Sequence, residues 1–286
     1  MKWIFLTIMP LLSAFKVTSQ GYFSKGKLNS TADMLKFTGY MSLFSALSLI
    51  IFTVRALPSF ETVIYAFILA ISSVSYQSLY SKAFTLGPIS LSSTIVSFSI
   101  VISIIFSIVA YNEPVTVFKI VGFVLMVFSL ILTPAKQSSN TKTSFKWLLF
   151  CFLTLIATGM YNIVQIVFSH SDFSSEKSAL IATSYIFASA ISFIIIPFIK
   201  GKQPLYKTDK KLAIFLPLMG LALGLYYLFN LSALELFPAS EFLPSLSALC
   251  LLCTILISCI LLKERLTIKQ IFGVISTILS VVFLNL

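Results

Sequence analysis

Lys16 and the polar residues near it are the first candidates for chemistry in this sequence. Lys16 lies in a mostly apolar segment, residues 3–23, and Ser13, Gln20 and Ser24 share its helical spacing. These four side chains therefore form one polar stripe on a helix. An ionisable group at membrane depth is costly and is therefore a functional candidate, and a cationic Lys16 could bind a substrate carboxylate or titrate with transport. The alternative is that its long side chain extends to the membrane surface.

Glu241 is the second ionisable candidate, because it follows Pro238 and precedes Pro244 in another apolar segment. Proline removes a backbone donor and can break a helix, so this segment is expected to expose backbone groups to a cavity. A carboxylate in that setting can bind and release a proton, which makes Glu241 a candidate for proton coupling. The alternative is an ordinary first-turn glutamate that the helix dipole stabilises.

Aromatic and amide side chains form similar stripes on three other apolar segments. The residues are Tyr76, Gln77 and Tyr80; Tyr161, Asn162 and Gln165; and Tyr227 and Asn230. Stripes of this kind either bond neighbouring helices or line a water-filled path. Taken one by one, packing explains each residue equally well. For the whole set, together with Lys16 and Gln20, we expect a cavity that suits a small polar or aromatic solute.

The sequence contains no motif typical of catalysis or of cofactor binding. It contains no Gly-rich phosphate loop, no metal-ligand cluster and no nucleophile–base arrangement. Cys250 and Cys253 form a CxxC pair, but no histidine or acid lies near them, and we interpret them as packing residues. We therefore predict no enzyme activity, no metal and no cofactor.

The composition indicates that the solvent of this chain is mostly lipid. Of 286 residues, 58% are hydrophobic and 10% are charged, whereas a soluble domain has roughly a quarter of its residues charged. Segments of about 20 apolar residues predict membrane-spanning helices. The predicted spans are 3–23, 37–54, 62–81, 89–111, 116–133, 146–168, 179–199, 212–232, 239–262 and 268–285. The fold class is thus an all-α integral membrane protein with ten transmembrane helices.

An internal repeat divides the chain. Residues 113–122 match residues 264–273 at an offset of 151, with Glu113 and Gly122 facing Glu264 and Gly273. Phe5 and Gln20 match Phe150 and Gln165 at an offset of 145. Residues 1–135 and 146–286 are therefore predicted to be two five-helix repeats. Because five is odd, the second repeat is inverted, an architecture that places substrate sites near the midplane. The repeat also predicts that segment 3–23 is a retained helix rather than a signal peptide.

Two pairs of matched motifs carry a resemblance to a known family. Residues 83–90 (AFTLGPIS) and 233–240 (ALELFPAS) each lead into a long apolar helix, and the motifs beginning at Glu113 and Glu264 each open the last helix of a half. In these features the whole chain resembles the EamA-type, ten-helix branch of the drug/metabolite transporter superfamily. The resemblance implies two inverted five-helix repeats, a central cavity and the export or exchange of amino acids, metabolites or drugs. We expect both glutamates to cap the helices that they precede.

The charge distribution and the resemblance predict opposite orientations. Fifteen Lys and Arg residues fall in the connections after the odd-numbered spans, and four (Lys2, Arg55, Lys119 and Lys177) fall on the other side. The positive-inside rule then puts both termini outside, while the resemblance implies termini inside. The net charge of +11 is explained by these connections rather than by nucleic-acid binding.

The sequence therefore predicts a secondary transporter of small metabolites, such as amino acids or related polar or aromatic solutes, in the plasma or inner membrane. Alternating access at a midplane site would move the solute, with protons as a possible second partner besides the lipid bilayer. Two alternatives are a non-transporting membrane regulator or assembly subunit and an integral membrane enzyme that acts on a lipid-linked substrate. The sequence predicts neither the substrate nor the oligomeric state.

Overall fold

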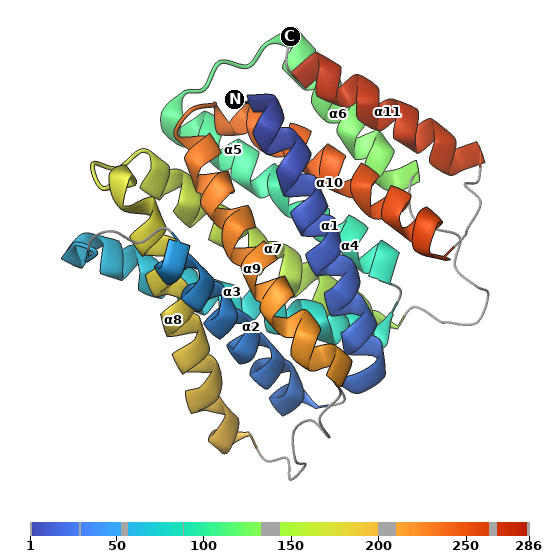
Figure 1. Ribbon diagram of the computed structural model, residues 1–286. Helices are drawn as coiled ribbons and strands as arrows, with labels where there is room; N and C mark the ends of the chain where they lie inside the picture. The colour runs from blue at the N-terminus through green and yellow to red at the C-terminus, as the bar shows by residue number, and fades with distance from the viewer. Residues whose placement is uncertain are drawn as a thin grey trace.

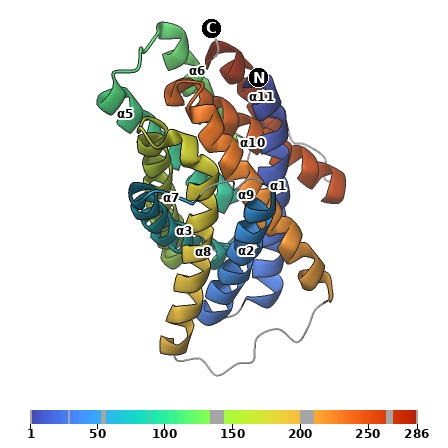
Figure 2. The ribbon, with the colours of Figure 1, turned by 60° about the vertical axis from the view of Figure 1, so that its left-hand side comes forward.

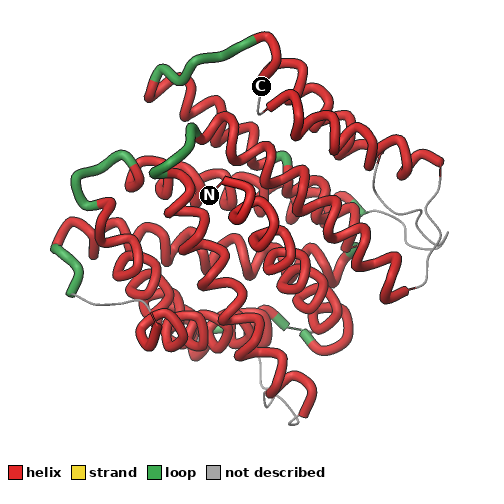
Figure 3. Tube along the Cα trace, turned by 45° about the horizontal axis from the view of Figure 1, so that its top comes forward, coloured by secondary structure: helices red, strands yellow, loops and turns green. Residues whose placement is uncertain are grey.

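Helices make up all the regular structure in the part of the chain that the computed structural model describes, which is residues 2–28, 30–52, 57–87, 89–132, 144–199, 210–262 and 268–284 (Figures 1 and 3). The first half contains α1 (Lys2–Lys27), α2 (Thr31–Phe52), α3 (Phe60–Leu86), α4 (Ile89–Ser97), α5 (Ser99–Tyr111) and α6 (Val117–Leu132). The second half contains α7 (Phe145–Ser169), α8 (Lys177–Ile195), α9 (Lys210–Leu234), α10 (Ala239–Leu262) and α11 (Ile268–Leu284). Two short 3-10 segments, η1 (Ser174–Glu176) and η2 (Ile196–Phe198), flank α8.

Several of these helices are built to lie in lipid. By length and composition, five described segments can cross a membrane: 31–51, 60–86, 145–169, 174–198 and 211–234. Shorter apolar helices include 95–111, 117–129 and 271–284. Large apolar side chains such as Phe128, Phe152 and Phe272 remain more than half exposed on the outside of the bundle. Surfaces of this kind need an apolar solvent, so the protein is a multi-pass membrane protein. The count of ten spans stays a prediction.

The predicted spans fall on helices, but the fourth is divided. Segment 89–111 forms α4 and α5, and the chain turns at Phe98 between them. The Ser97 hydroxyl donates to the carbonyl of Ser93 (2.8 Å), a bond of the type that bends helices. The prediction of a single continuous helix over residues 89–111 is therefore wrong.

The break expected at Pro244 is also absent, because α10 continues without interruption from Ala239 to Leu262. Pro244 lies in the second turn of α10 and is buried. A proline at this position removes one backbone donor, the one that would reach the carbonyl of Ser240, and the turns on either side remain intact. The interruption of a helix thus occurs at Phe98 in the first half and not at Pro244 in the second.

Contacts between the halves come in matched pairs. α1 packs against α9 and α10, and its counterpart α7 packs against α3 and α5. In the same way, α2 packs against α9 and α3 packs against α8, while α2–α8 and α6–α11 join counterparts directly (Figures 1 and 2). Exchanging the two halves therefore reproduces each of these contacts. This is the packing expected of two related units that bury their surfaces against each other.

Glycines allow the closest of these contacts. A Cβ atom on Gly220 of α9 would lie 2.7 Å from the carbonyl oxygen of Met41 on α2. A Cβ atom on Gly122 of α6 would lie 2.7 Å from the side chain of Leu284 on α11. The carbonyl of Gly122 also accepts a hydrogen bond from Ser280 (2.7 Å). Small residues at helix interfaces in membranes allow backbones to approach in this way.

Candidate functional site

A cavity of about 160 Å³ lies between the two halves. Its walls come from α1, α3, α4 and α5 of the first half and from α7, α9 and α10 of the second. The polar lining residues are Ser13, Lys16, Tyr76, Tyr80, Ser93, Ser97, Ser99, Thr158, Asn162, Tyr226, Tyr227, Asn230, Ser247 and Cys250. The α1 contribution, from Leu12 to Val17, lies near the middle of that helix, so the cavity lies at about half the length of α1.

Lys16 is the only charged side chain among the described residues of this lining. Its side chain is 7% exposed, so it lies within the bundle. The Lys16 ammonium is 5.6 Å from the centre of the Tyr76 ring, a cation–π contact. None of the carboxylates in the described ranges forms an ion pair with it. The structure thus places a buried lysine amine at the cavity, without a carboxylate partner among the described residues.

Tyrosines form the wall next to Lys16. The hydroxyl of Tyr227 on α9 donates to the hydroxyl of Tyr76 on α3 (3.0 Å), which joins the two halves. The Tyr226 ring meets Tyr227 edge-on, with ring centres 5.0 Å apart. Tyr161 is outside the lining but packs behind it, with its ring centre 4.7 Å from that of Tyr227 and 5.5 Å from that of Tyr76. The cavity wall is therefore both aromatic and hydroxylated.

The predicted glutamines lie behind the cavity rather than in it. Gln20 is fully buried, and its Nε2 donates to the Ser81 hydroxyl (2.9 Å). Gln165, its counterpart in the second half, accepts a hydrogen bond from Nδ2 of Asn230 (2.7 Å). Gln77 donates to Ser73 on its own helix (2.8 Å). The two counterpart glutamines thus tie the first helix of each half to the third. Asn230 lines the cavity, so Gln165 positions a lining residue.

Several lining residues were missed by the sequence reasoning. Ser93, Ser97 and Ser99 face the cavity around the α4–α5 break, and Ser247 faces it from α10. The four-residue spacing of Ser93 and Ser97 in an apolar segment was a usable signal. Cys250, which was interpreted as a packing residue, also lines the cavity. Serine and cysteine are common packing residues in membrane helices, so composition does not separate the two roles.

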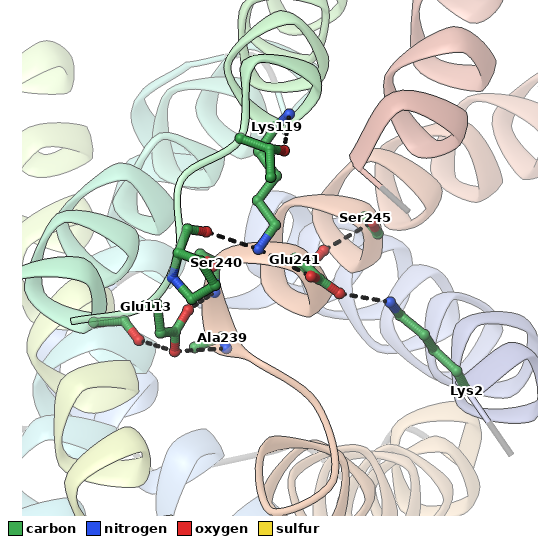
Figure 4. Close-up of polar contacts among 10 residues, drawn as sticks. Lys2, Glu113, Lys119, Ala239, Ser240, Glu241 and Ser245 are labelled. Atoms are coloured by element: carbon green, nitrogen blue, oxygen red, sulfur yellow. Dashed lines mark hydrogen bonds and ion pairs between the residues drawn. The ribbon is translucent and has the colours of Figure 1, made fainter. Parts of the chain in front are cut away.

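Glu113 joins the halves at the end of the bundle where the N-terminus lies, which we call the termini end (Figures 1 and 4). Its carboxylate accepts hydrogen bonds from the backbone N–H groups of Ala239 (3.0 Å) and Ser240 (2.8 Å), and from the Ser107 hydroxyl. It therefore caps α10 of the second half. Burial disfavours the charged carboxylate, but these hydrogen bonds outweigh it and hold the pKa of Glu113 below its usual value.

The expectation that Glu113 caps the helix that it precedes is therefore wrong. That helix is α6, and the hydroxyl of Thr116 already accepts from the Lys119 N–H in its first turn (3.2 Å). Glu113 is thus left to satisfy the free N–H groups of α10. Its counterpart Glu264 lies outside the described residues. Gly273 is buried in α11, and its carbonyl accepts from Thr277 (2.9 Å).

Glu241 lies in the same region and not in the cavity lining. Its carboxylate forms ion pairs with Lys2 of α1 (3.1 Å) and Lys119 of α6 (2.9 Å) (Figure 4). Lys119 also donates to the carbonyl of Pro114 (2.9 Å). Glu241 therefore connects the second half to two helices of the first. The structure brings Lys16, Tyr76, Tyr80, Asn162, Tyr227 and Asn230 together at the cavity and leaves Glu241 apart from them.

Comparisons with known proteins agree with this architecture. One crystal structure, described only as "Crystal structure of protein", has a TM-score of 0.75 to this chain and covers 98% of both chains at 8% sequence identity. That likeness shows the fold alone. A search of the curated proteins found no match. The EamA-like transporter family matches twice, at residues 1–134 and 145–286, which together span nearly the whole sequence. The chain belongs to the EamA-like transporter family, whose members are membrane transporters of the drug/metabolite type.

Proposed function

We propose that this protein is a secondary transporter that moves a small metabolite through the cavity between its two halves. The observation that carries the proposal is a buried, polar and aromatic cavity whose walls come from counterpart helices of both halves. Such an interface is where inverted-repeat transporters bind their substrates. In the proposed molecule, residues 1–135 and 146–286 are two inverted repeats with ten spans in total, in the plasma membrane.

Transport then requires the halves to rock about the cavity, and the structure corresponds to a state closed at the termini end. Polar contacts cross between the halves there, from Glu113 to α10 and from Lys2 and Lys119 to Glu241. Ser59 at the start of α3 adds a third connection, because its N–H donates to Glu176 of the second half (2.8 Å). Opening this end requires these contacts to break.

A hydrophobic layer supports the same closure. Leu6 and Met9 of α1 and Phe242 of α10 are buried in one cluster with Ile104 of α5. This layer lies between the cavity and the ion pairs of Glu241, one turn of α10 away from Leu246 in the lining. Packed apolar side chains exclude water, so the layer and the ion pairs together block the path to the termini end.

Glu241 is proposed as a closing residue on this basis. Its role as a proton carrier stays a prediction. In a carrier, Glu241→Gln abolishes pH-driven flux and leaves exchange intact. Unchanged pH-driven flux would remove Glu241 from consideration as the carrier.

Flux in proteoliposomes tests the proposed function directly. Vesicles are loaded with a mixed metabolite pool, with and without a pH gradient, and mass spectrometry identifies what crosses beyond empty-vesicle controls. Ser247→Phe adds bulk to a lining residue and is expected to reduce flux at least about tenfold, which corresponds to a transport barrier higher by roughly 1.4 kcal/mol. Ser75→Phe, a matched change outside the lining, should leave flux intact. No solute movement by folded wild-type protein would contradict transport.

A further inference from the structure

We infer that the substrate is a small organic carboxylate without a free ammonium group, and that its carboxylate binds at Lys16. The inference rests on the proposed function, because it names the substrate class of the same cavity. It differs from the family's general expectation of amino acids in excluding the zwitterionic form. Charge, geometry and the nature of the cavity wall each carry a part of it.

The charge balance of the cavity calls for one anion. Lys16 is 7% exposed and is the single charged side chain in the described lining. Its ammonium contacts the Tyr76 ring at 5.6 Å, and no carboxylate in the described ranges pairs with it. A buried ammonium without a counter-ion is strongly unfavourable, so Lys16 carries its charge most readily when an anion is bound beside it. Ionisable groups inside membrane helices commonly line substrate paths. A substrate carboxylate would supply the missing negative charge.

The same lining offers no acid to pair with a substrate cation. It contains neither Asp nor Glu among its described members. The acids at the termini end are already engaged, Glu241 with two lysines and Glu113 with the first turn of α10. In an α-amino acid the ammonium is attached next to the carboxylate, so binding at Lys16 would place two cations side by side. A hydroxyl in that position could instead accept a hydrogen bond from the Lys16 ammonium and donate one to a neighbouring oxygen.

The rest of the cavity suits an aromatic or branched apolar body. The rings of Tyr76, Tyr226 and Tyr227 form one side, and Leu12 and Leu246 contribute apolar surface. The volume of about 160 Å³ is below the roughly 300–1,000 Å³ of sites for drug-sized ligands, so the body must be small. Monocarboxylic 2-hydroxy acids with an aromatic or branched side chain meet all three requirements.

Binding to the purified full-length protein in nanodiscs tests the inference, with isothermal titration calorimetry as the measurement. The probes are 3-phenyllactate, phenylalanine and 2-phenylethylamine, which share one ring and differ in charge, together with 2-hydroxyisocaproate as the branched acid. We expect at least one hydroxy acid to bind ten or more times tighter than phenylalanine, and 2-phenylethylamine not to bind, on the scale where tenfold is about 1.4 kcal/mol. Equal or tighter binding of phenylalanine, binding of the amine, or failure of both acids would overturn the inference.

Two variants assign the effect to Lys16. Lys16→Gln should weaken binding of the hydroxy acid at least tenfold, whereas Lys16→Arg keeps the charge and should retain most of it. Without ligand, the melting temperature of Lys16→Gln should equal or exceed that of the wild type, because an unpaired buried cation has been removed. That result separates lost binding from lost folding. Unchanged binding in Lys16→Gln would contradict the assignment.

Flux measurements separate this inference from the proposed function. If hydroxy acids bind at Lys16 but no solute crosses the vesicle membrane, the inferred ligand class is supported and the proposed transport function is overturned. If amino acids cross and hydroxy acids neither bind nor compete, transport stands and the substrate class is overturned.

Discussion

The hydroxyl of Tyr227 forms a direct side-chain hydrogen bond between the halves in the cavity wall, since it donates to the Tyr76 hydroxyl at 3.0 Å. Both tyrosines are more than nine-tenths buried. A buried hydrogen bond of this kind contributes about 1 kcal/mol to stability. It also joins the Tyr76 ring, which contacts Lys16, to a ring of the opposite half. Tyr227 thus combines a structural role with a position in the candidate site.

Removing that hydroxyl gives the prediction at the residue scale. Tyr227→Phe should lower the free energy of unfolding by about 1 kcal/mol and change which solutes compete for transport, because the Tyr76 hydroxyl is left without its donor. The measurements are thermal unfolding and competition in the flux assay. Tyr22→Phe is the matched control, since Tyr22 is 63% exposed on α1. An unaltered competition profile in Tyr227→Phe would count against its place in the site.

Single residues were predictable where polarity contrasts with an apolar helix. Lys16, Tyr76 and Asn230 stand out for that reason, and the structure places all three at the cavity. Their contact with a substrate stays a prediction. Glu241 stood out equally, but its position depends on which helices surround the start of α10. Such neighbours come from long-range packing, and no local pattern in the sequence specifies them.

At the scale of elements, Glu113 connects a loop of the first half to the start of α10 in the second. Since hydrogen bonds hold its pKa below the usual value, the ionised carboxylate stabilises the fold. This contribution is complete above the usual pKa of a glutamate and is lost as the pH falls through the lower pKa of the folded protein. Glu113 therefore stabilises the inter-half contact at neutral pH and not in strong acid.

Glu113→Gln should accordingly destabilise the protein by about 1 kcal/mol at neutral pH, a typical loss for a helix cap. The difference from the wild type should disappear at strongly acidic pH, below the lowered pKa of folded Glu113, where the wild-type carboxyl is protonated as well. Unfolding curves at the two pH values measure this. Glu61→Gln is the control, because Glu61 is exposed in the first turn of α3. A deficit of equal size at both pH values would show that the charge is not what stabilises the contact.

Helix positions were largely predictable because apolar length is a local property. Segment 239–262, for example, coincides with α10. The interruption at Phe98 was not predicted, because it has no proline or glycine and depends on serine side chains that compete for backbone carbonyls. At Pro244 the sequence predicted an interruption that the structure does not have, since α10 continues through it. A proline interrupts a helix only where the surrounding packing does not hold the turns on both sides together.

For the whole molecule, the contacts of Glu241 predict how the termini end opens. Glu241→Gln removes the charge that holds Lys2 and Lys119, so the population open at that end should rise several-fold. Cys250 lines the cavity and can report this if Cys151, Cys253 and Cys259 are replaced by Ala. The measurement is the rate at which a membrane-impermeant maleimide labels Cys250 from the side that carries an N-terminal tag.

Glu235→Gln provides the control for that experiment. Glu235 pairs with Lys177 near the start of α8, so both partners belong to the second half. Its loss breaks an ion pair without releasing one half from the other. Labelling of Cys250 should therefore remain at the wild-type rate. A similar increase in both variants, or none in Glu241→Gln, would contradict the proposed closing role.

The repeat itself was visible in the sequence because matched residues recur at nearly constant offsets. For Gln20 and Gln165 the repeat extends to their hydrogen bonds, since each side chain bonds to the third helix of its own half. The register of the halves against each other was not visible. It depends on close contacts such as that of Gly220 with the backbone of α2, which involve residues far apart in the chain.

The interleaved contacts mean that neither half is a self-sufficient body. The main partner of α6 is α11, and α2 lies chiefly against α8 and α9, so a half on its own would leave its largest apolar faces without their partners. In this sense the protein behaves like a dimer whose two subunits happen to be joined by a peptide link between α6 and α7. Two fragments divided at that link and synthesised together should therefore reassemble into the folded protein. Either fragment synthesised alone should fail to fold.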